Sequence, residues 1–399
     1  MTGWGSTPRT LGAGSLARPR QRMSARALAR ESPLRRLDWV LLFAVLALAI
    51  LGSLLVWSAT RSHQEQAGAD PAYYFKRHLV NLVIGLVLGA VTMLVDYRAL
   101  RAYAPFVYVG SVFGLLAVLA VGKTINGSHS WIVLPAGFQI QPSEFAKVAI
   151  VVGGAMLLGE KRDGEDEPRF GDIFQMLLLV AFPVGLIMLQ PDLGTVMVVV
   201  FILFGMLAVS NAPARWLVGL LVAGFIGGAL IIQVGLLKDY QINRFKAFAN
   251  PTADTRSVSY NQNQAKITIG AGGVFGKGLF HGTQTEGQFV PEQQTDFVFT
   301  VAGEELGLVG AGGIILLVGV VLFRGIRIAN RAEDSFGRLV ATGVVCWFAF
   351  QAFENIGMTL GIMPVTGLPL PFVSYGGSSM FANLIAIGLL QNVHLHREK

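Results

Sequence analysis

Cysteine and charged residues are both scarce in this chain of 399 residues. It has one cysteine, Cys346, which excludes a disulfide within the chain and a cysteine-rich metal motif. Charged residues make up 14% of the sequence and hydrophobic residues 53%, whereas soluble domains contain about 25% charged residues. A soluble fold of this size would lack the charges that its surface needs. The composition therefore excludes an ordinary soluble protein and predicts a chain surrounded by lipid.

Long apolar runs are abundant. A helix that crosses a membrane needs roughly 20 mostly apolar residues, and the runs are too long for the strands of a barrel. The sequence therefore predicts an all-α polytopic membrane protein of about ten transmembrane helices. The runs are approximately 39–59, 79–95, 102–121, 143–159, 173–189, 193–209, 216–237, 297–323, 339–363 and 378–393.

Lysine and arginine predict the orientation, because cytoplasmic loops carry an excess of both. With the N-terminus in the cytoplasm, the inside tails and loops hold 20 of the 31 Lys and Arg residues. Both termini are then cytoplasmic. Residues 1–37 are rich in Arg, Ala, Ser and Pro, which predicts a disordered basic tail before a transmembrane domain at 38–396. The positive charge sits mostly at helix ends on one side, so it does not indicate nucleic-acid binding.

Two outside segments are longer than the others. Residues 238–296 form a large extracytoplasmic loop between the seventh and eighth predicted helices. Long loops without secondary structure are usually functional or disordered. This loop carries aromatic residues and apolar stretches such as 265–269, which predicts that it packs on the membrane domain. The other segment, 122–142, contains Trp131 and two prolines.

Charged residues inside membrane spans are costly and usually face a cavity or one another. Glu144 and Lys147 are three residues apart at the start of the fourth span, so they share a helix face. They form either a structural ion pair or the polar wall of a cavity that binds an anionic or sugar ligand. Glu304 and Glu305 lie inside the eighth span and point about 100° apart, so we expect one of them to pair within the bundle.

Two aspartates lie where a loop meets a span. Asp192 either caps the sixth helix or faces a site, because Pro-Asp is good turn chemistry. Asp296 ends the long loop and begins the eighth span. It can cap that helix, and an ionised carboxylate at the membrane surface can also take a proton from a sugar hydroxyl. The spacing alone leaves both roles open.

Several motifs together resemble the SEDS family of cell-wall polymerases, which includes RodA, FtsW and SpoVE. The resemblance covers roughly residues 38–393. Within it, the sequences at 281–284 and 366–371 are similar to those of the RodA branch, which serves elongation. One departure is Ser130, because many relatives have a basic residue just before the tryptophan that matches Trp131. The motifs are Gln141-Pro142-Ser143-Glu144-x-x-Lys147, Gln190-Pro191-Asp192-Leu193-Gly194-Thr195, the segment Lys266 to Glu305, and Pro364 to Ser378.

The resemblance implies a fold like the GT-C type of glycosyltransferase and the polymerisation of lipid II into β-1,4 glycan strands. The acceptor hydroxyl displaces undecaprenyl diphosphate with inversion. Asp296 matches the family's proposed catalytic residue. The expected substrate-binding residues are Trp131, Glu144, Lys147, Asp192, Arg244, Lys266, Lys277 and Gln284, with the lysines and Arg244 suited to a diphosphate.

Cofactors and partners follow from the same resemblance. The sequence has no Asp-x-Asp pair or histidine cluster that marks a metal site, and a divalent cation (Mg²⁺ or Mn²⁺) on the diphosphate is the one cofactor left open. The partners are a class B penicillin-binding protein, which is a transpeptidase, and the membrane proteins of the elongation machinery. The implied location is the bacterial cytoplasmic membrane, with the active site on the extracytoplasmic side. The alternatives are a lipid II flippase, which polar residues within helices suit equally well, and a scaffold that recruits cell-wall enzymes without catalysis.

Overall fold

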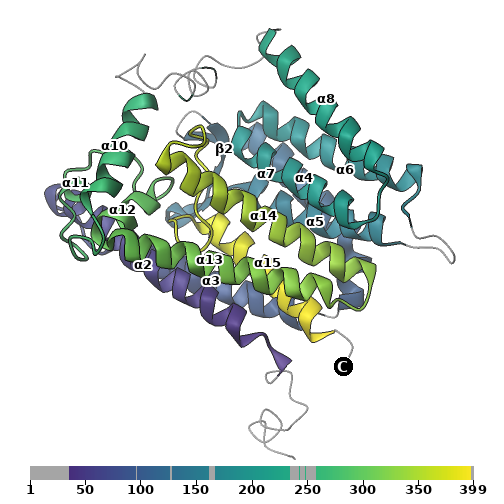
Figure 1. Ribbon diagram of the computed structural model, residues 1–399, viewed down its shortest axis with the longest axis horizontal. Coiled ribbons are helices and arrows are strands. Elements are labelled where there is room, and N and C mark those ends of the chain that lie inside the picture. The colour runs from purple at the N-terminus through teal and green to yellow at the C-terminus, as the bar shows by residue number, and fades with distance from the viewer. Residues whose placement is uncertain are drawn as a thin grey trace, which may run out of the picture. The chain divides into compact units, whose positions relative to one another are not determined.

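A computed structural model describes residues 36–95, 97–125, 128–160, 167–233, 242, 248 and 258–396. The basic tail predicted at 1–37 lies almost entirely outside the described residues, and so does Arg244. From Asp38 onward the chain forms one unit. This unit is a bundle of helices, as the sequence predicted (Figure 1).

Ten helices make up most of the described bundle, and three shorter ones accompany them. The long helices are α2 (Trp39–Gln66), α3 (Tyr73–Leu94), α4 (Tyr97–Val121), α5 (Pro142–Gly159), α6 (Phe170–Leu189), α7 (Leu193–Val209), α8 (Ala214–Gln233), α13 (Gly307–Asn330), α14 (Ser335–Leu360) and α15 (Gly377–Leu395). The shorter helices are α10 (Val258–Ala271), α11 (Thr283–Glu286) and α12 (Val298–Glu305).

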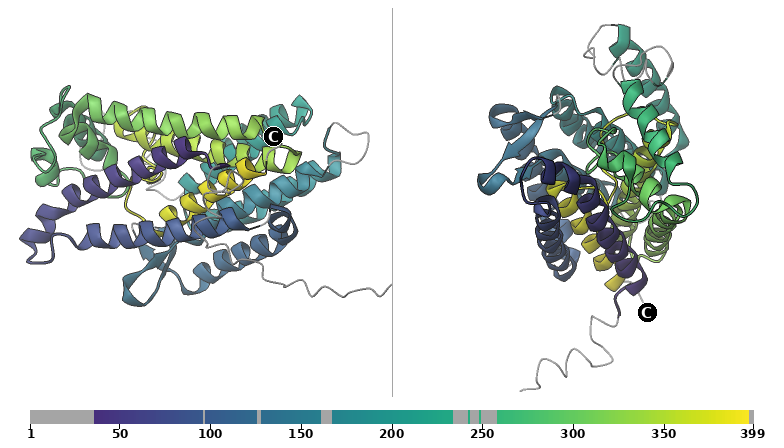
Figure 2. Two further views of the ribbon diagram at one scale, coloured as in Figure 1. Left: turned by 90° about the horizontal axis from the view of Figure 1, so that it is seen from below. Right: turned by 90° about the vertical axis from the view of Figure 1, so that its left-hand side faces the viewer.

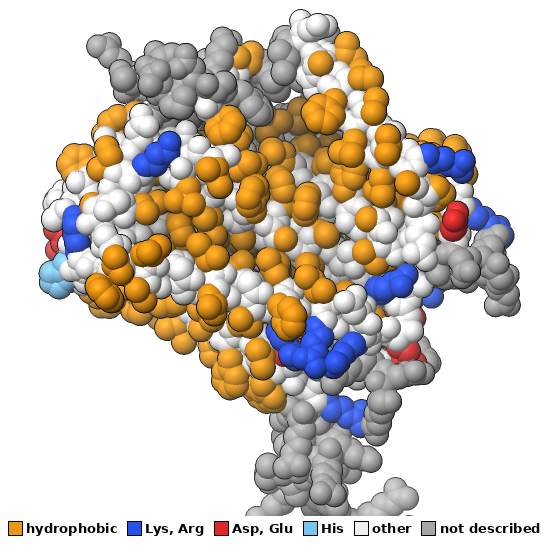
Figure 3. All heavy atoms as spheres, viewed as in Figure 1, with side chains coloured by type: hydrophobic (Ala, Val, Ile, Leu, Met, Phe, Trp, Pro, Cys, Tyr) orange, Lys and Arg blue, Asp and Glu red, His pale blue; other side chains and the backbone are white. Residues whose placement is uncertain are grey.

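Seven of the described helices are long and apolar enough to cross a membrane: α2, α3, α4, α5, α6, α13 and α14. The predicted polytopic membrane fold is thereby confirmed, whereas the count of ten spans stays a prediction. Hydrophobic side chains cover much of the face in Figure 3, and many of its Lys and Arg side chains lie toward the end where α2 begins.

The centre of the bundle is formed by α5 and α14, whose most apolar stretches are 78% and 61% buried. α14 packs against α5, α7 and α13, and α15 packs along α3. Figure 2 shows α15, in yellow, beside α3, in dark blue. The central position of α14 brings its polar side chains to the loop segments that join the helices.

A small antiparallel sheet occupies the segment 122–142, where the sequence predicted no strands. It consists of β1 (Lys123–Ile125), β2 (Ser128–Val133) and β3 (Gln139–Ile140), in the order β1-β2-β3. A 3₁₀ turn, Pro135–Gly137, joins the last two strands. Trp131 lies on β2 of this sheet, at one end of the helix bundle.

The predicted eighth span, 297–323, is wrong as a continuous helix. It breaks at Leu306 into α12 and α13, and Gly307 has a positive φ of 65°. A Cβ at Gly307 would lie 2.2 Å from the backbone nitrogen of Gly276, so only glycine fits this turn. The backbone amide of Lys277 donates to the carbonyl of Glu304 at 3.0 Å. The long loop therefore replaces the helical hydrogen bonds that the break removes.

The described part of the long loop packs on the membrane domain, as predicted. α10 lies against α12 and α14. Its Ala265 joins Val290, Phe297, Met358 and Val365 in a buried apolar cluster. This cluster fixes the start of α12 beside the end of α14, and so it places the turn that contains Asp296.

Candidate active site

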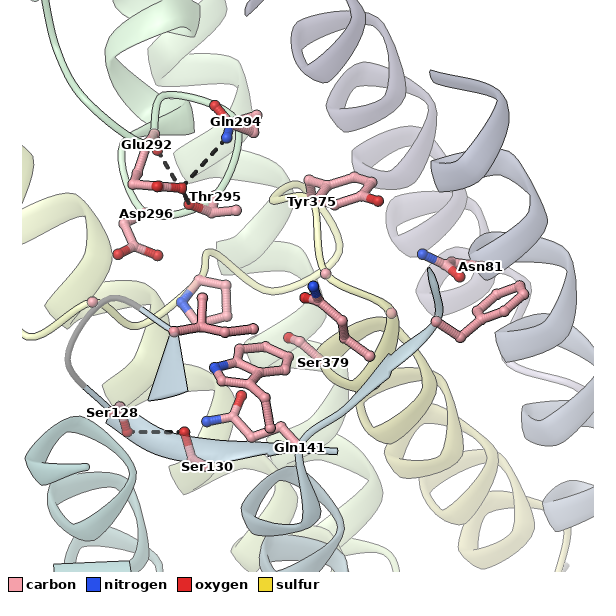
Figure 4. Close-up of a pocket in the computed structure, with 18 of the residues that line it drawn as sticks. Asn81, Ser128, Ser130, Gln141, Glu292, Gln294, Thr295, Asp296, Tyr375 and Ser379 are labelled. Atoms are coloured by element: carbon pink, nitrogen blue, oxygen red, sulfur yellow. Dashed lines mark hydrogen bonds between the residues drawn. The ribbon is translucent and has the colours of Figure 1, made fainter. Parts of the chain in front are cut away.

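A cavity of about 460 Å³ opens at one end of the bundle. Its wall comes from α3, the small sheet, the turn at 191–192, the loop at 292–296 and the segment 366–379. Figure 4 shows these segments converging, with the loop of Asp296 opposite the sheet. Of the predicted site residues, Trp131, Asp192 and Asp296 line the cavity.

Asp296 lies in a tight turn. The carbonyl oxygen of Glu292 accepts hydrogen bonds from the backbone amides of Thr295, Asp296 and Phe297 at 3.1–3.3 Å. Helix α12 begins at Val298 with Phe297 at its N-cap, so Asp296 does not occupy the N-cap position that was one of the two roles left open. The side chain of Asp296 points toward the cavity (Figure 4).

Gly367 allows the segment after α14 to pass close to this carboxylate. Its φ is +80°, and a Cβ there would lie 3.1 Å from Oδ2 of Asp296. A positive φ favours glycine, and the short approach leaves little room for a side chain. The turn at Gly367 therefore shapes the wall beside Asp296.

Glu292 places a second carboxylate in the wall of the same loop. Its Oε2 accepts hydrogen bonds from the Thr295 hydroxyl at 3.2 Å and from the Gln294 amide at 3.4 Å. The sequence motif contained Glu292, but its position gave no indication of a role in the cavity.

Asp192 caps α7 and lines the cavity at the same time. Its Oδ1 accepts from the amide of Thr195 at 3.0 Å, which is the capping bond. Its Oδ2 accepts from the Thr195 hydroxyl at 2.8 Å and from the Gln141 side-chain amide at 3.1 Å. These bonds hold Asp192 in place and occupy much of its capacity as an acceptor.

Arg77, on α3, lines the cavity and was missed by the sequence analysis. Its guanidinium lies 4.9 Å from the ring centroid of Phe138 and 5.9 Å from that of Tyr73, and it donates to the Tyr73 hydroxyl at 2.8 Å. Among the described lining residues it is the one Lys or Arg. The sequence could have indicated Arg77, because it lies at the outer end of a predicted span, where basic residues are few.

Tyr375 joins two walls of the cavity. Its backbone amide donates to the carbonyl of Gln294 at 2.8 Å, and its ring packs on Tyr74 with centroids 5.2 Å apart. Burial raises the pKa of Tyr375 to about 12, although the nearby charge of Arg77 opposes the rise. The phenol is therefore neutral at physiological pH and does not act as a base.

Glu144 and Lys147 do not line the cavity, which favours the structural ion pair over the polar wall. Lys147 is fully buried and its Nζ lies 2.8 Å from Oε1 of Glu144. It also donates to Oε1 of Gln351 at 3.0 Å and lies 4.6 Å from the ring centroid of Trp347. The pair is a buried structural ion pair that connects α5 to α14.

Three predicted substrate-binding residues of the long loop that the structure describes, Lys266, Lys277 and Gln284, also lie away from the cavity. Lys277 binds Oε1 of Glu304 at 2.7 Å, and the backbone amide of Gln284 donates to the same oxygen at 2.9 Å. The side chain of Lys266 lies over Gly361, where α14 ends. Lys277 is therefore paired within the fold, and Lys266 lies where a cation favours the dipole of α14.

The two glutamates of α12 both have partners, where one was expected to pair. Glu304 accepts from Lys277, Gln284 and Thr285, and Glu305 accepts from the hydroxyl of Ser58 on α2.

No group of three or more His, Cys, Asp or Glu residues suited to a metal occurs in the described ranges. A divalent cation bound through the diphosphate stays a prediction.

Comparison with known proteins assigns the family. The model of the FtsW/RodA/SpoVE family, described as cell cycle protein, matches residues 38–399. The Escherichia coli K12 protein "Peptidoglycan glycosyltransferase MrdB" is 37% identical over 91% of this chain and 94% of its own length. "Probable peptidoglycan glycosyltransferase FtsW" of Trichlorobacter lovleyi is 36% identical over 89% of this chain and 92% of its own.

A sporulation protein and two solved structures also match this chain. "Stage V sporulation protein E" of Bacillus subtilis is 39% identical over 89% of this chain and 96% of its own. The structure of Thermus thermophilus rod shape determining protein RodA matches with a TM-score of 0.67 and 32% identity, over 91% of this chain and 98% of that one. A chain from a peptidoglycan synthase complex matches with a TM-score of 0.73 and 34% identity, over 90% and 97%. Together with the cavity and its motifs, these matches establish that the chain belongs to the SEDS family of FtsW, RodA and SpoVE proteins.

Proposed function

We propose that this protein is a peptidoglycan glycosyltransferase that polymerises lipid II into β-1,4 glycan strands and releases undecaprenyl diphosphate. The observation that carries the proposal is the presence of the Asp296 carboxylate and the Arg77 guanidinium in one cavity at the end of a membrane bundle. A proton acceptor and a fixed positive charge are what transfer from a sugar diphosphate requires. The names of the curated relatives support the same activity.

In the proposed reaction, the 4-hydroxyl of a lipid-linked disaccharide is the acceptor. Asp296 takes the proton of this hydroxyl as its oxygen attacks the anomeric carbon of the growing strand. The bond from that carbon to the diphosphate breaks, the diphosphate leaves with the electron pair, and the configuration inverts. Arg77 is placed to stabilise the charge on the departing diphosphate, in the role that the sequence analysis gave to the loop lysines and Arg244.

Asp296 is the best candidate for the base among the described carboxylates of the wall. Asp192 accepts four hydrogen bonds, one of which caps α7. Glu292 accepts from the hydroxyl of Thr295 and the amide of Gln294 within its own turn. Asp296 faces the cavity beside Gly367, and it occupies the position of the family's proposed catalytic aspartate.

Two other functions were left open by the sequence. A flippase was suggested by charged residues within the spans, but Glu144 and Lys147 are explained by their buried pairing. A scaffold without catalysis would not need carboxylates and an arginine around a cavity of about 460 Å³. Both observations favour the polymerase.

The activity can be tested with purified protein and lipid II, with and without the cognate class B penicillin-binding protein. We expect glycan chains in at least one of the two reactions, visible by gel electrophoresis after removal of the lipid. Absence of chains in both reactions, together with movement of lipid II across vesicles that contain the protein, would establish the flippase instead.

The partner and cellular role form part of the proposal. The solved complex whose chain resembles this one concerns the coordination of polymerization and crosslinking, which supports a class B penicillin-binding protein as the partner. The RodA-like sequences of the motifs at 281–284 and 366–371 support a role in cell elongation, together with the other membrane proteins of the elongation machinery. We place the protein in the bacterial cytoplasmic membrane with both termini cytoplasmic and the cavity outside.

Replacing Arg77 with methionine should lower kcat/KM for glycan polymerisation about tenfold to a hundredfold, because a hydrogen bond to a charged group contributes about 1.5–3 kcal/mol. Methionine keeps most of the apolar contact with Phe138 and Tyr73. The neighbouring Lys76 pairs with Asp70 on the surface, so Lys76→Met is the matched control and should retain activity. Equal rates for Arg77→Met and wild type would remove Arg77 from the proposed mechanism.

Cysteine labelling tests the orientation. In a Cys346→Ala background, a cysteine at Glu286 should react with a membrane-impermeant maleimide added to intact cells, because this exposed residue lies in the long outside loop. A cysteine at Glu333, an exposed position between α13 and α14, should react only after the cells are permeabilised. The reverse pattern at both positions would place the cavity in the cytoplasm.

A further inference from the structure

Asn355 of α14 connects two segments that meet at the cavity. Its side chain is fully buried. Its Nδ2 donates to the backbone carbonyl of Asp296 at 2.7 Å and to that of Leu368, also at 2.7 Å. These carbonyls lie 59 and 13 residues away in the sequence. One side chain therefore holds the turn of Asp296 beside the segment that contains Gly367.

The chemistry of the amide suits this connection. An asparagine side chain has two N–H donors on one nitrogen, and each of them meets one carbonyl. Two carbonyl acceptors at this distance also define which end of the amide is nitrogen, because an amide oxygen cannot bond to either of them. Buried backbone carbonyls need donors, so an apolar residue at position 355 would leave both without this partner.

Two neighbouring polar side chains of α14 hold the same segment through hydrogen bonds to residues other than those of the Asp296 turn. Gln351 donates through Nε2 to the carbonyl of Pro369 at 2.8 Å. Glu354 accepts from the hydroxyl of Thr366 at 2.9 Å. The helix thus fixes residues 366–369 at several points, and Asn355 adds the bond that ties Asp296 to them.

We propose that Asn355 is a positioning residue, which holds the backbone of Asp296 against residues 366–369 so that its carboxylate keeps a fixed place in the cavity. This inference rests on the proposed function, in which Asp296 is the base. A displacement of about 1 Å in a reacting group can lower a rate about a hundredfold. Without this bond, the turn of Asp296 is held to the wall by fewer contacts, and its position becomes less fixed.

The test compares Asn355→Leu with wild type in two measurements. The first is glycan polymerisation, in which we expect kcat to fall between about tenfold and a hundredfold, while KM stays within about threefold because the variant leaves the lining side chains in place. The second is hydrogen–deuterium exchange of the purified protein without substrate. Peptides that cover 292–297 and 366–369 should exchange faster, whereas those of α5 should not change.

Thr359→Val is the matched control. Thr359 is also buried on α14, and its hydroxyl donates to the carbonyl of Ile356 within the helix. This control removes a buried polar group but no hydrogen bond to the Asp296 turn, so exchange at 292–297 and kcat should stay at wild-type values. If Asn355→Leu does not accumulate, Asn355→Ser replaces it, because a serine hydroxyl donates one bond at most and should produce a smaller change in the same direction.

The two measurements separate the possible failures. If wild type is inactive but hydrogen–deuterium exchange is faster in the variant, the proposed function is wrong, while the structural connection made by Asn355 is established. An active wild type, with unchanged exchange at 292–297 and unchanged kcat in the Asn355 variant, would overturn the positioning role. Equal increases in exchange for Asn355→Leu and Thr359→Val would reduce Asn355 to general packing and would also overturn it.

Discussion

Replacing Asp296 with asparagine should lower glycan polymerisation by a factor of roughly 100 or more, which is the usual scale for loss of a general base. The two side chains have nearly the same size, but an amide cannot take the proton of the acceptor hydroxyl at neutral pH. Because Phe297 and not Asp296 occupies the N-cap of α12, the substitution leaves the N-cap residue unchanged. The hydrogen bond from the Asn355 side chain to the backbone carbonyl of Asp296 is also retained.

The measurement is glycan chain formation by equal amounts of purified wild type and Asp296→Asn, with the same transpeptidase present. Asp70→Asn serves as a control, since Asp70 is an exposed aspartate that pairs with Lys76. Matching elution profiles and unfolding temperatures would show that all three proteins are folded. Near-normal polymerisation by Asp296→Asn would exclude it as the base and direct attention to Glu292 in the same turn.

The sequence was sufficient for the helices and for part of the site. Apolar runs mark membrane helices because lipid leaves no other partner for the backbone. Trp131, Asp192 and Asp296 line the cavity; they were named because the family resemblance implied them, and each lies at the outer end of a predicted span or in an outside segment. Residues at the same membrane depth can meet even when their separation in the sequence is large.

Other features depend on contacts that only the folded chain reveals. The break at Gly307 arises because the turn at Gly276 packs against it, and a hydrophobic pattern continues across such a break unchanged. Lys277 was interpreted as a phosphate ligand, but Glu304 is its partner. Arg77 resembles an ordinary basic residue at a helix end, and its role depends on Phe138, which is distant in the sequence.

The same limit applies to Glu144 and Lys147, whose spacing predicted a shared helix face but left their role open. The spacing could not show that Gln351 and Trp347 of α14 would enclose the amine. With both charges almost fully buried, the energetics of the pair differ from those of an exposed ion pair. A measurement of stability can therefore distinguish the two interpretations independently of activity.

Removal of the Lys147 charge by Lys147→Met should destabilise the protein by about 3–5 kcal/mol, because it leaves a buried carboxylate without its cation. Oε2 of Glu144 already has no hydrogen-bond partner, so the loss of Lys147 isolates the whole group. Glu144→Gln should be less harmful, since Lys147 keeps the oxygen of Gln351 at 3.0 Å and the ring of Trp347. The double variant should lose less stability than the sum of the two single variants, because neither charge then remains unpaired.

Denaturant titration in detergent gives the free energy of unfolding of wild type, both single variants and the double variant. These four values give the coupling energy of the pair. The exposed pair of Lys76 and Asp70, with atoms 2.6 Å apart and side chains 67% and 46% exposed, provides the control cycle. Its coupling should be about 0–1 kcal/mol, as for other surface ion pairs. If the effects at 144 and 147 simply add, the two residues do not act as a unit. A Lys147→Met variant with normal stability but a raised KM would return Lys147 to the substrate-binding role that its burial argues against.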